Sequence, residues 1–125
     1  MRLLLDTHIF YWWFYEPERL SPATLKIIRG SERVFVSSVS IWEIAIKARL
    51  GKIDANPQEL FDQIEVNGFH ELPVWSKHAL RVAGLPLHHT DPFDRLLIAQ
   101  AVSEPLHLLT ADPQLKRYSQ LVIQI

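Results

Sequence analysis

The amino-acid sequence predicts an α/β fold built around a central, mostly parallel β-sheet. Short apolar, β-like runs alternate along the chain with segments of helical pattern, which is the order typical of α/β proteins. These runs lack the strict alternation of polar and apolar residues that marks strands with one solvated face, so both faces of the sheet are expected to be covered. The 125 residues, 48% hydrophobic and 22% charged, are expected to form one domain over residues 1–125.

Turn and cap signals separate the predicted elements along the chain. Five strands are predicted, at residues 2–5, 33–38, 69–72, 106–109 and 121–125. One helix is expected to begin near Thr7. Ser, Asn or Asp followed by Pro is an N-cap signal, and it occurs at Ser21-Pro22, Asn56-Pro57, Asp91-Pro92 and Asp112-Pro113. Gly30 and Gly68 mark two helix ends.

Composition excludes several kinds of site. The chain has no cysteine, which excludes disulfides, thiolate metal ligands and a cysteine nucleophile. A net charge of −1 gives no global attraction to nucleic acid, so a polyanionic substrate has to be held by a local patch or by metal ions. No apolar run is long enough to span a bilayer and no secretory signal pattern opens the chain, so a cytoplasmic protein without membrane contact is expected.

Acidic residues follow several of the predicted strands. Asp6 comes directly after the strand 2–5, Glu43 lies just beyond the strand 33–38, and Asp112 follows the strand 106–109 after two residues. The carboxyl ends of parallel strands meet at one edge of a sheet, where ligands bind. The sequence therefore predicts that these separated carboxylates gather at one edge, together with Asp91 and Asp94 at the start of the helix from Pro92.

Each acidic residue also has a purely structural explanation. Asp6 and Asp112 are plausible N-caps, and Ser40-x-x-Glu43 reads as a capping box. Glu43 and Lys47 are spaced as a helical ion pair. Asp91 is better placed than Asp94 to cap the helix that starts at Pro92. Asp94 then lies in the first turn, on the helical face of Ile98 and Ala101, which is expected to pack against the core. For each acidic residue considered on its own, a structural role such as capping is the favoured explanation.

Taken as a set, the acidic residues indicate a metal site. Carboxylates that share a site repel one another unless a cation neutralises them. A small site made only of carboxylate oxygens suits Mg²⁺ or Mn²⁺. We therefore expect Asp91 mainly to cap its helix and Asp94 mainly to face metal.

Four segments, in this order, resemble the PIN-domain nucleases, and specifically the VapC-like toxins of type II toxin–antitoxin pairs. They are "LLLDTH" (3–8), "SSVSIWEIAIKARLGKI" (37–53), "LPLHHTDPFDRLLIAQA" (85–101) and "LLTAD" (108–112), and together they cover nearly the whole chain. The family's acidic quartet falls on Asp6, Glu43, Asp94 and Asp112, as catalytic and metal-binding residues. Asp91, Thr7 and Thr110 fall on accessory positions.

The resemblance implies a three-layer α/β/α fold and a toxin that cleaves RNA internally. It further implies that Mg²⁺ or Mn²⁺ activates the water that hydrolyses the phosphodiester bond, that the chain forms a homodimer, and that a VapB-like antitoxin inhibits it. A housekeeping ribonuclease of the same family remains an alternative. So does a non-catalytic binding module in which the acidic residues serve only as caps.

Cationic and aromatic residues suggest contacts to partners. Lys47 and Arg49, with Lys52 nearby, form a basic patch, and Lys47, Arg49 and Arg95 are possible contacts to RNA. "FYWWFY" (10–15) covers the whole circumference of a helix, so it is either sandwiched within the chain or forms an interface on one side. His88-His89 lacks the spacing of a zinc site and is expected to be a loop pair.

Overall fold

The computed structural model describes residues 1–125 and contains five strands, six α-helices and two short 3-10 helices. The strands are β1 (Arg2–Leu5), β2 (Arg33–Ser37), β3 (His70–Leu72), β4 (His107–Thr110) and β5 (Val122–Gln124). The helices are α1 (Thr7–Tyr15), α2 (Pro22–Gly30), α3 (Ser38–Arg49), α4 (Pro57–Val66), α5 (Ser76–Val82) and α6 (Pro92–Ser103), with 3-10 turns at Pro17–Arg19 and Leu115–Arg117. All five predicted strands are confirmed to within one residue at each end. None of the helices is both long and apolar enough to cross a membrane.

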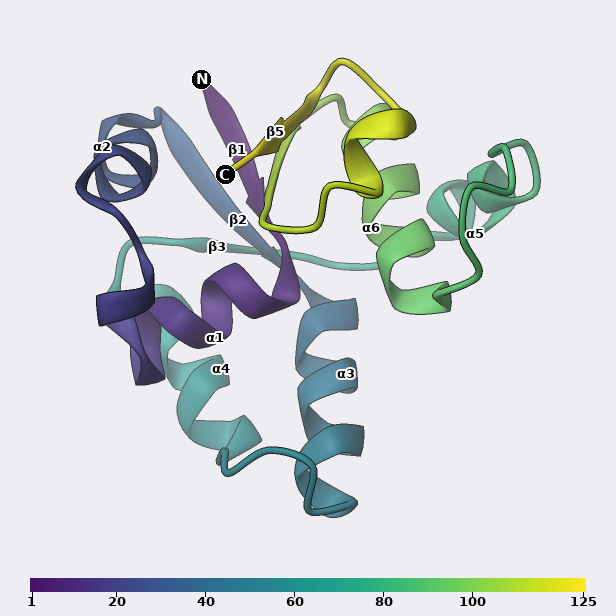
Figure 1. The fold of residues 1–125 in the computed structure, drawn as a ribbon. Coiled ribbons are helices and arrows are strands. Elements are labelled where there is room, and N and C mark those ends of the chain that lie inside the picture. Colours follow the sequence, from purple (N-terminus) through teal and green to yellow (C-terminus); the bar gives the residue numbers. More distant parts are fainter.

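The strands form a single sheet in the order β3-β2-β1-β4-β5, and every neighbouring pair is parallel. The central strand β1 pairs with β2 on one side and β4 on the other (Figure 1). The chain builds outward from β1 through β2 to β3, then crosses to β4 and β5. The strand order therefore reverses between β1 and β4, and such a reversal opens a crevice beyond the carboxyl ends of the strands.

Helices cover both faces of the sheet, as the three-layer prediction requires. Alternate residues of β1 point to opposite faces. Leu3 and Leu5 belong to a buried cluster with α1, α2 and α4, whereas Leu4 belongs to a second cluster with α6. Helix α5 packs on the outside of α6, and α3 leaves the end of β2 between α4 and α6 (Figure 1). Both sides of the carboxyl edge are thus enclosed by helices.

The aromatic run of α1 is divided between two sides of the helix. Phe10 is fully buried in the core. Trp13 packs against Phe69, with ring centroids 5.4 Å apart, and its Nε1 donates to the side chain of Asn67. Trp12 lies on another side of the helix and is only half-buried. Both indoles are half-buried and pack against the core, but only the indole of Trp13 has a hydrogen-bond partner.

The structure corrects the predicted start of the helix that carries Glu43. The helix α3 begins at Ser38, and Ser37 caps it by accepting a hydrogen bond from the Val39 amide at 3.0 Å. Ser40 is instead fully buried, with its hydroxyl 2.9 Å from that of Thr7. The capping box is wrong because the turn after β2 leads directly into the helix, which places Glu43 in the second turn.

Helix α5 was not predicted, because its stabilising contacts are distant in sequence. It has seven residues and no Ser-Pro or Asp-Pro start. His78, fully buried, accepts a hydrogen bond from the Trp75 amide through Nδ1, and its Nε2 lies 2.6 Å from Glu104 at the end of α6. This contact, together with Lys77, lowers the pKa of Glu104. The contact with Glu104, 26 residues further along the chain, cannot be recognised from the residues of α5 alone.

Candidate active site

Four strand or helix ends bring the predicted acidic residues to the carboxyl edge of the sheet. Asp6 follows β1, Asp112 follows β4 after Ala111, Glu43 lies on the helix after β2, and Asp94 lies in the first turn of α6. We call these four residues the acidic cluster. They surround the point where the strand order reverses, which is the position at which open parallel sheets bind ligands.

Three members of the acidic cluster line one small cavity. It has a volume of about 260 Å³, and we call it the acidic cavity. Its lining residues are Asp6, His8, Trp12, Asp94, Ala111 and Asp112. Glu43 does not line the cavity and is 2% exposed, but its charge is near enough to raise the pKa values of Asp6 and Asp94. The structure thus gathers all four carboxylates into one electrostatic unit.

Thr110 joins the ends of the two central strands. Its buried hydroxyl donates to Asp6 Oδ2 at 2.6 Å and accepts from the Asp112 amide at 3.0 Å. The Asp6 amide donates to the Leu109 carbonyl, which continues the pairing of β1 with β4. Asp6 is the N-cap residue of α1, but its side chain makes no cap hydrogen bond, so the predicted side-chain cap is wrong. One oxygen of Asp6 is instead held by Thr110, and the other is buried without a hydrogen-bond partner.

Asp91 and Asp94 divide two roles at the start of α6. Asp91 Oδ1 accepts from the amides of Phe93 and Asp94, at 2.9 and 3.1 Å, so Asp91 is the N-cap that the sequence predicts. The side chain of Asp94 is thereby left to the cavity. His89 Nε2 faces Asp94 Oδ2 at 3.5 Å, and His89 Nδ1 lies 2.7 Å from the Tyr118 hydroxyl. His89, from the loop before α6, thus lies beside Asp94 without a hydrogen bond between them.

Burial and mutual repulsion disfavour the ionised carboxylates of the acidic cluster. Burial, followed by the charges of Asp6, Asp91, Glu43 and Asp112, raises the pKa of Asp94 to about 8. Burial also raises the pKa of Asp6, against the lowering effect of the Thr110 hydroxyl. Asp6 Oδ1 and Glu43 Oε1 are buried and have no hydrogen-bond partner. Buried carboxylate oxygens of this kind need a proton or a cation.

A magnesium or manganese ion fits this donor set. The unpartnered oxygens belong to carboxylates, which these hard cations prefer. No three acidic or histidine side chains converge closely enough to enclose an ion by themselves. An ion held here would therefore take only one or two protein carboxylates and keep several waters, as Mg²⁺ does beside substrate phosphates. Lys47, whose Nζ lies 2.7 Å from Glu43 Oε2, supplies part of the neutralising charge.

The structure corrects one predicted contact to RNA. Arg95 is 8% exposed, and its guanidinium donates to the carbonyls of Pro86, Val82 and Leu85 and to the Tyr118 hydroxyl. The group is therefore used to hold the loop that precedes α6 and does not reach a bound strand. Arg49 is exposed at the end of α3, and Lys47 is partly exposed beside Glu43.

Two residues that line the acidic cavity were missed as site residues. His8 lies two positions after Asp6, and Trp12 follows His8 by one helical turn, so both rings face the same side of α1. The position of His8, two residues after the strand-ending Asp6, is the sequence signal that could have identified it.

The His88-His89 pair lies against the Tyr118 ring, and the two histidines form no zinc-binding geometry.

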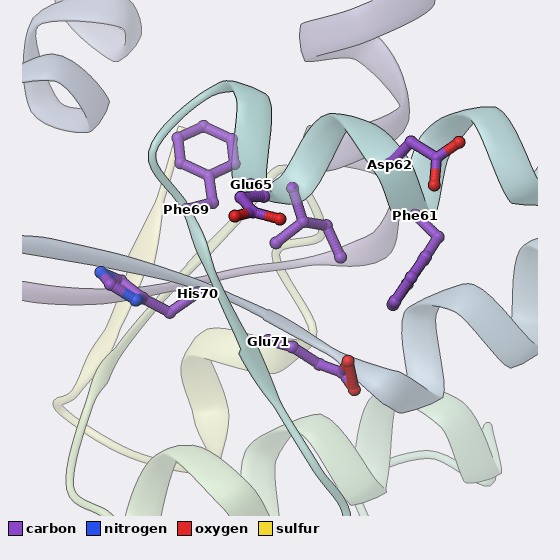
Figure 2. A pocket seen from close by; sticks show the side chains of 7 residues that line it. Phe61, Asp62, Glu65, Phe69, His70 and Glu71 are labelled. Carbon is purple, nitrogen blue, oxygen red and sulfur yellow. The ribbon is translucent and has the colours of Figure 1, made fainter.

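A further cavity of about 500 Å³ lies away from the acidic cluster. Figure 2 shows its lining, in which α4, the edge strand β3 and the turn between them contribute Phe61, Asp62, Ile64, Glu65, Phe69, His70 and Glu71. No member of the acidic cluster is among these residues, so the two cavities are separate.

Comparison with known proteins identifies the family. The model of the PIN domain family matches residues 3–121. The chain belongs to the PIN domain family. This PIN domain is 32% identical over 123 residues to Ribonuclease VapC22 of Mycobacterium tuberculosis (strain ATCC 25618 / H37Rv), with 93% of this chain and 91% of that protein covered. The predicted resemblance is confirmed, and with it the enzyme class, a nuclease.

Solved structures share the fold of this PIN domain. VapBC2 from Rickettsia felis, bound to a DNA fragment from its promoter, matches with a TM-score of 0.74 at 18% identity, covering 100% of this chain and 98% of that chain. A toxin–antitoxin complex from Klebsiella pneumoniae matches with a TM-score of 0.67 at 16% identity, covering 98% and 99%. DNA-bound VapBC from Salmonella typhimurium gives 0.68 at 15% identity, covering 100% and 97%. At these identities the matches show a common fold.

Proposed function

We propose that this PIN domain is a metal-dependent endoribonuclease and the toxin of a toxin–antitoxin pair. The observation that carries the proposal is the acidic cluster: Asp6, Asp94 and Asp112 line one cavity, and one oxygen each of Asp6 and Glu43 is buried without a hydrogen-bond partner. A module with acidic caps alone would have its carboxylates bonded to helix amides. Only Asp91 is bonded in that way, whereas Asp112 accepts from the Gln114 amide, which lies just before the 3-10 turn Leu115–Arg117.

The cluster's residues have distinct roles in this proposal. Asp6, Glu43 and Asp94 would share one ion, one or two of them directly and the rest through its bound waters, and Asp112 would hold a second ion or orient water. When bound, Mg²⁺ or Mn²⁺ supplies Lewis acidity that activates water and offsets charge on the phosphate. No side-chain nucleophile is then needed, in agreement with a chain that has no cysteine.

The protein's own groups position these carboxylates. The Thr110 hydroxyl fixes one oxygen of Asp6 and leaves the other without a protein partner. Lys47 binds one oxygen of Glu43 and likewise leaves the second free. Asp91 fixes the first turn of α6, which sets the direction of Asp94. Carboxylates held in this way need little reorganisation when a phosphodiester group arrives.

The partners of the proposed toxin are a VapB-like antitoxin and a second copy of the chain. The similarity to VapC22 and to proteins solved as VapBC or toxin–antitoxin complexes supports the antitoxin. Induced expression of the wild-type chain alone should arrest bacterial growth, and the Asp6→Ala variant should not. Undisturbed growth with active nuclease would favour a housekeeping enzyme. Sedimentation of the purified chain, with and without antitoxin, tests the homodimer.

The decisive experiment is RNA cleavage by the purified, antitoxin-free chain. Cleavage is compared in Mg²⁺, Mn²⁺ and EDTA, and the products are tested for 5′-phosphate and 3′-hydroxyl ends. Asp6→Ala and Asp94→Asn, prepared identically, should be inactive while keeping the wild-type circular dichroism spectrum.

The matched control is Asp62→Asn. Asp62 is an exposed aspartate on α4, and its Oδ1 accepts from Gln58, a bond that asparagine also accepts. This variant should cleave like the wild type. Equal cleavage by all variants would reveal a contaminating ribonuclease. No cleavage and no Mg²⁺ binding by the folded wild type would refute the proposed function.

A further inference from the structure

A second cavity adjoins the acidic cavity. It has a volume of about 470 Å³, and it shares two lining residues, His8 and Trp12, with the acidic cavity. We call it the aromatic cavity. Since the same two rings border both spaces, a strand whose phosphate lies at the acidic cluster has a neighbouring nucleotide next to the aromatic cavity. No member of the acidic cluster lines this second space.

Three rings from α1 line the aromatic cavity. His8, Tyr11 and Trp12 have the spacing of one helical face, and the rings of His8 and Trp12 lie 6.1 Å apart. Trp12 is half-buried and its indole makes no hydrogen bond, whereas Trp13 on the other side is used by the fold. An aromatic face beside a polar cavity is the feature on which unpaired bases stack.

Three cations line the same cavity. Lys47 and Arg19 are each paired with a glutamate, at 2.7 and 3.1 Å, while Lys52 is exposed and forms no ion pair. Arg19 also lies over the Trp12 ring, 5.4 Å from its centroid. Glu16 and Asp54 are the acidic members of the lining. Rings combined with lysine and arginine match a nucleotide, whose base stacks and whose phosphate is anionic.

We infer that the aromatic cavity is a base-binding subsite for single-stranded RNA. An unpaired nucleotide next to the cleaved phosphate stacks its base on Trp12 and places a phosphate beside Lys52. The inference rests on the proposed ribonuclease function and adds to it the residues that bind a base beside the cleaved phosphate. A base in a duplex cannot enter the cavity without leaving its stack.

The test separates base binding from phosphate binding. Fluorescein-labelled RNA octamers of A, U or C, and an abasic octamer with the same backbone, are titrated with protein in EDTA while anisotropy is recorded. EDTA prevents the proposed cleavage, so the result does not depend on activity. The wild type should bind at least one base-bearing octamer more tightly than the abasic one.

Two variants assign the contacts. Trp12→Ala should weaken binding of the preferred octamer roughly 5- to 150-fold, as expected for the loss of one stacked base, and should leave the abasic octamer unchanged. Trp12→Phe keeps a ring and should recover most of the affinity. Lys52→Ala should weaken all octamers, including the abasic one, and lower the salt dependence of binding by about 0.7 in log–log slope.

The matched control is Trp75→Ala, another exposed tryptophan, which lines neither cavity. It should bind every octamer as the wild type does. Equal affinity of the wild type for base-bearing and abasic octamers would overturn the inference, and so would unchanged binding by Trp12→Ala. The cavity would then be a groove for a protein segment. Failure of the ribonuclease proposal would appear separately, as absent cleavage in Mg²⁺ by a protein that still discriminates the octamers.

Discussion

Replacing Asp94 by asparagine tests the electrostatic description of the acidic cluster. In the unfolded chain this carboxyl ionises near its ordinary pKa of 3.8, and in the folded protein it stays protonated up to about pH 8. Between these two values the folded state binds more protons than the unfolded state. The free energy of unfolding contributed by Asp94 is therefore fully present at low pH and is lost as the pH rises towards 8.

The size of this loss follows from the shift of the pKa. Moving the pKa from 3.8 to about 8 corresponds to at most about 6 kcal/mol, at 1.36 kcal/mol per pKa unit. The side chain of Asp94 is 16% exposed and faces His89 at 3.5 Å, so solvent and this neighbour reduce the effect. Asparagine does not ionise. Relative to the wild type, we expect Asp94→Asn to gain roughly 2–4 kcal/mol between about pH 5 and 8.

Urea unfolding at several pH values, without metal, measures this difference. Asp62→Asn, with the same change on the exposed face of α4, should instead follow the wild type at every pH. Saturating Mg²⁺ at pH 8 should stabilise the wild type, by about 2.7 kcal/mol at a hundred times the dissociation constant, and should stabilise Asp94→Asn much less. If the free energies of unfolding of the wild type and Asp94→Asn changed with pH in the same way, a raised pKa of Asp94 would be refuted.

Three further substitutions test positioning contacts. Thr110→Val removes the hydroxyl that donates to Asp6, so we expect a loss of about 1–3 kcal/mol in urea unfolding and weaker Mg²⁺ binding by calorimetry. Arg95→Met removes the buried guanidinium that donates to three backbone carbonyls and to the Tyr118 hydroxyl, so it should lower the free energy of unfolding by roughly 2–4 kcal/mol in the same assay. A change in the salt dependence of RNA binding would instead indicate that Arg95 contacts a phosphate. Ser37→Ala removes the true cap of α3 and should cost about 1 kcal/mol, measured by thermal unfolding.

Much of the fold could be predicted because its signals are local. The strands lie where the apolar runs lie, and Ser21, Asn56 and Asp91 each cap a helix through the side chain that the sequence identifies. Gly68 ends its segment with a φ of 73°, which glycine adopts at little cost. Where stabilising contacts span distant parts of the chain, prediction failed. The helix α5 depends on Glu104, and Ser40, the serine expected to cap α3, instead contacts Thr7.

The acidic residues themselves were identified from the sequence, since each follows a strand or opens a helix. Their grouping depends on the strand order, which reverses beside β1 and so brings Asp6, Asp94 and Asp112 to one cavity. Burial is likewise a tertiary property. It turns Glu43 from a surface ion-pair partner into an enclosed carboxylate, raises the pKa of Asp94, and directs Arg95 inward to backbone carbonyls. The sequence by itself determined which groups carry charge and which local structure holds them. Only the tertiary structure decided which charges face one another, because that depends on contacts between segments far apart in the chain.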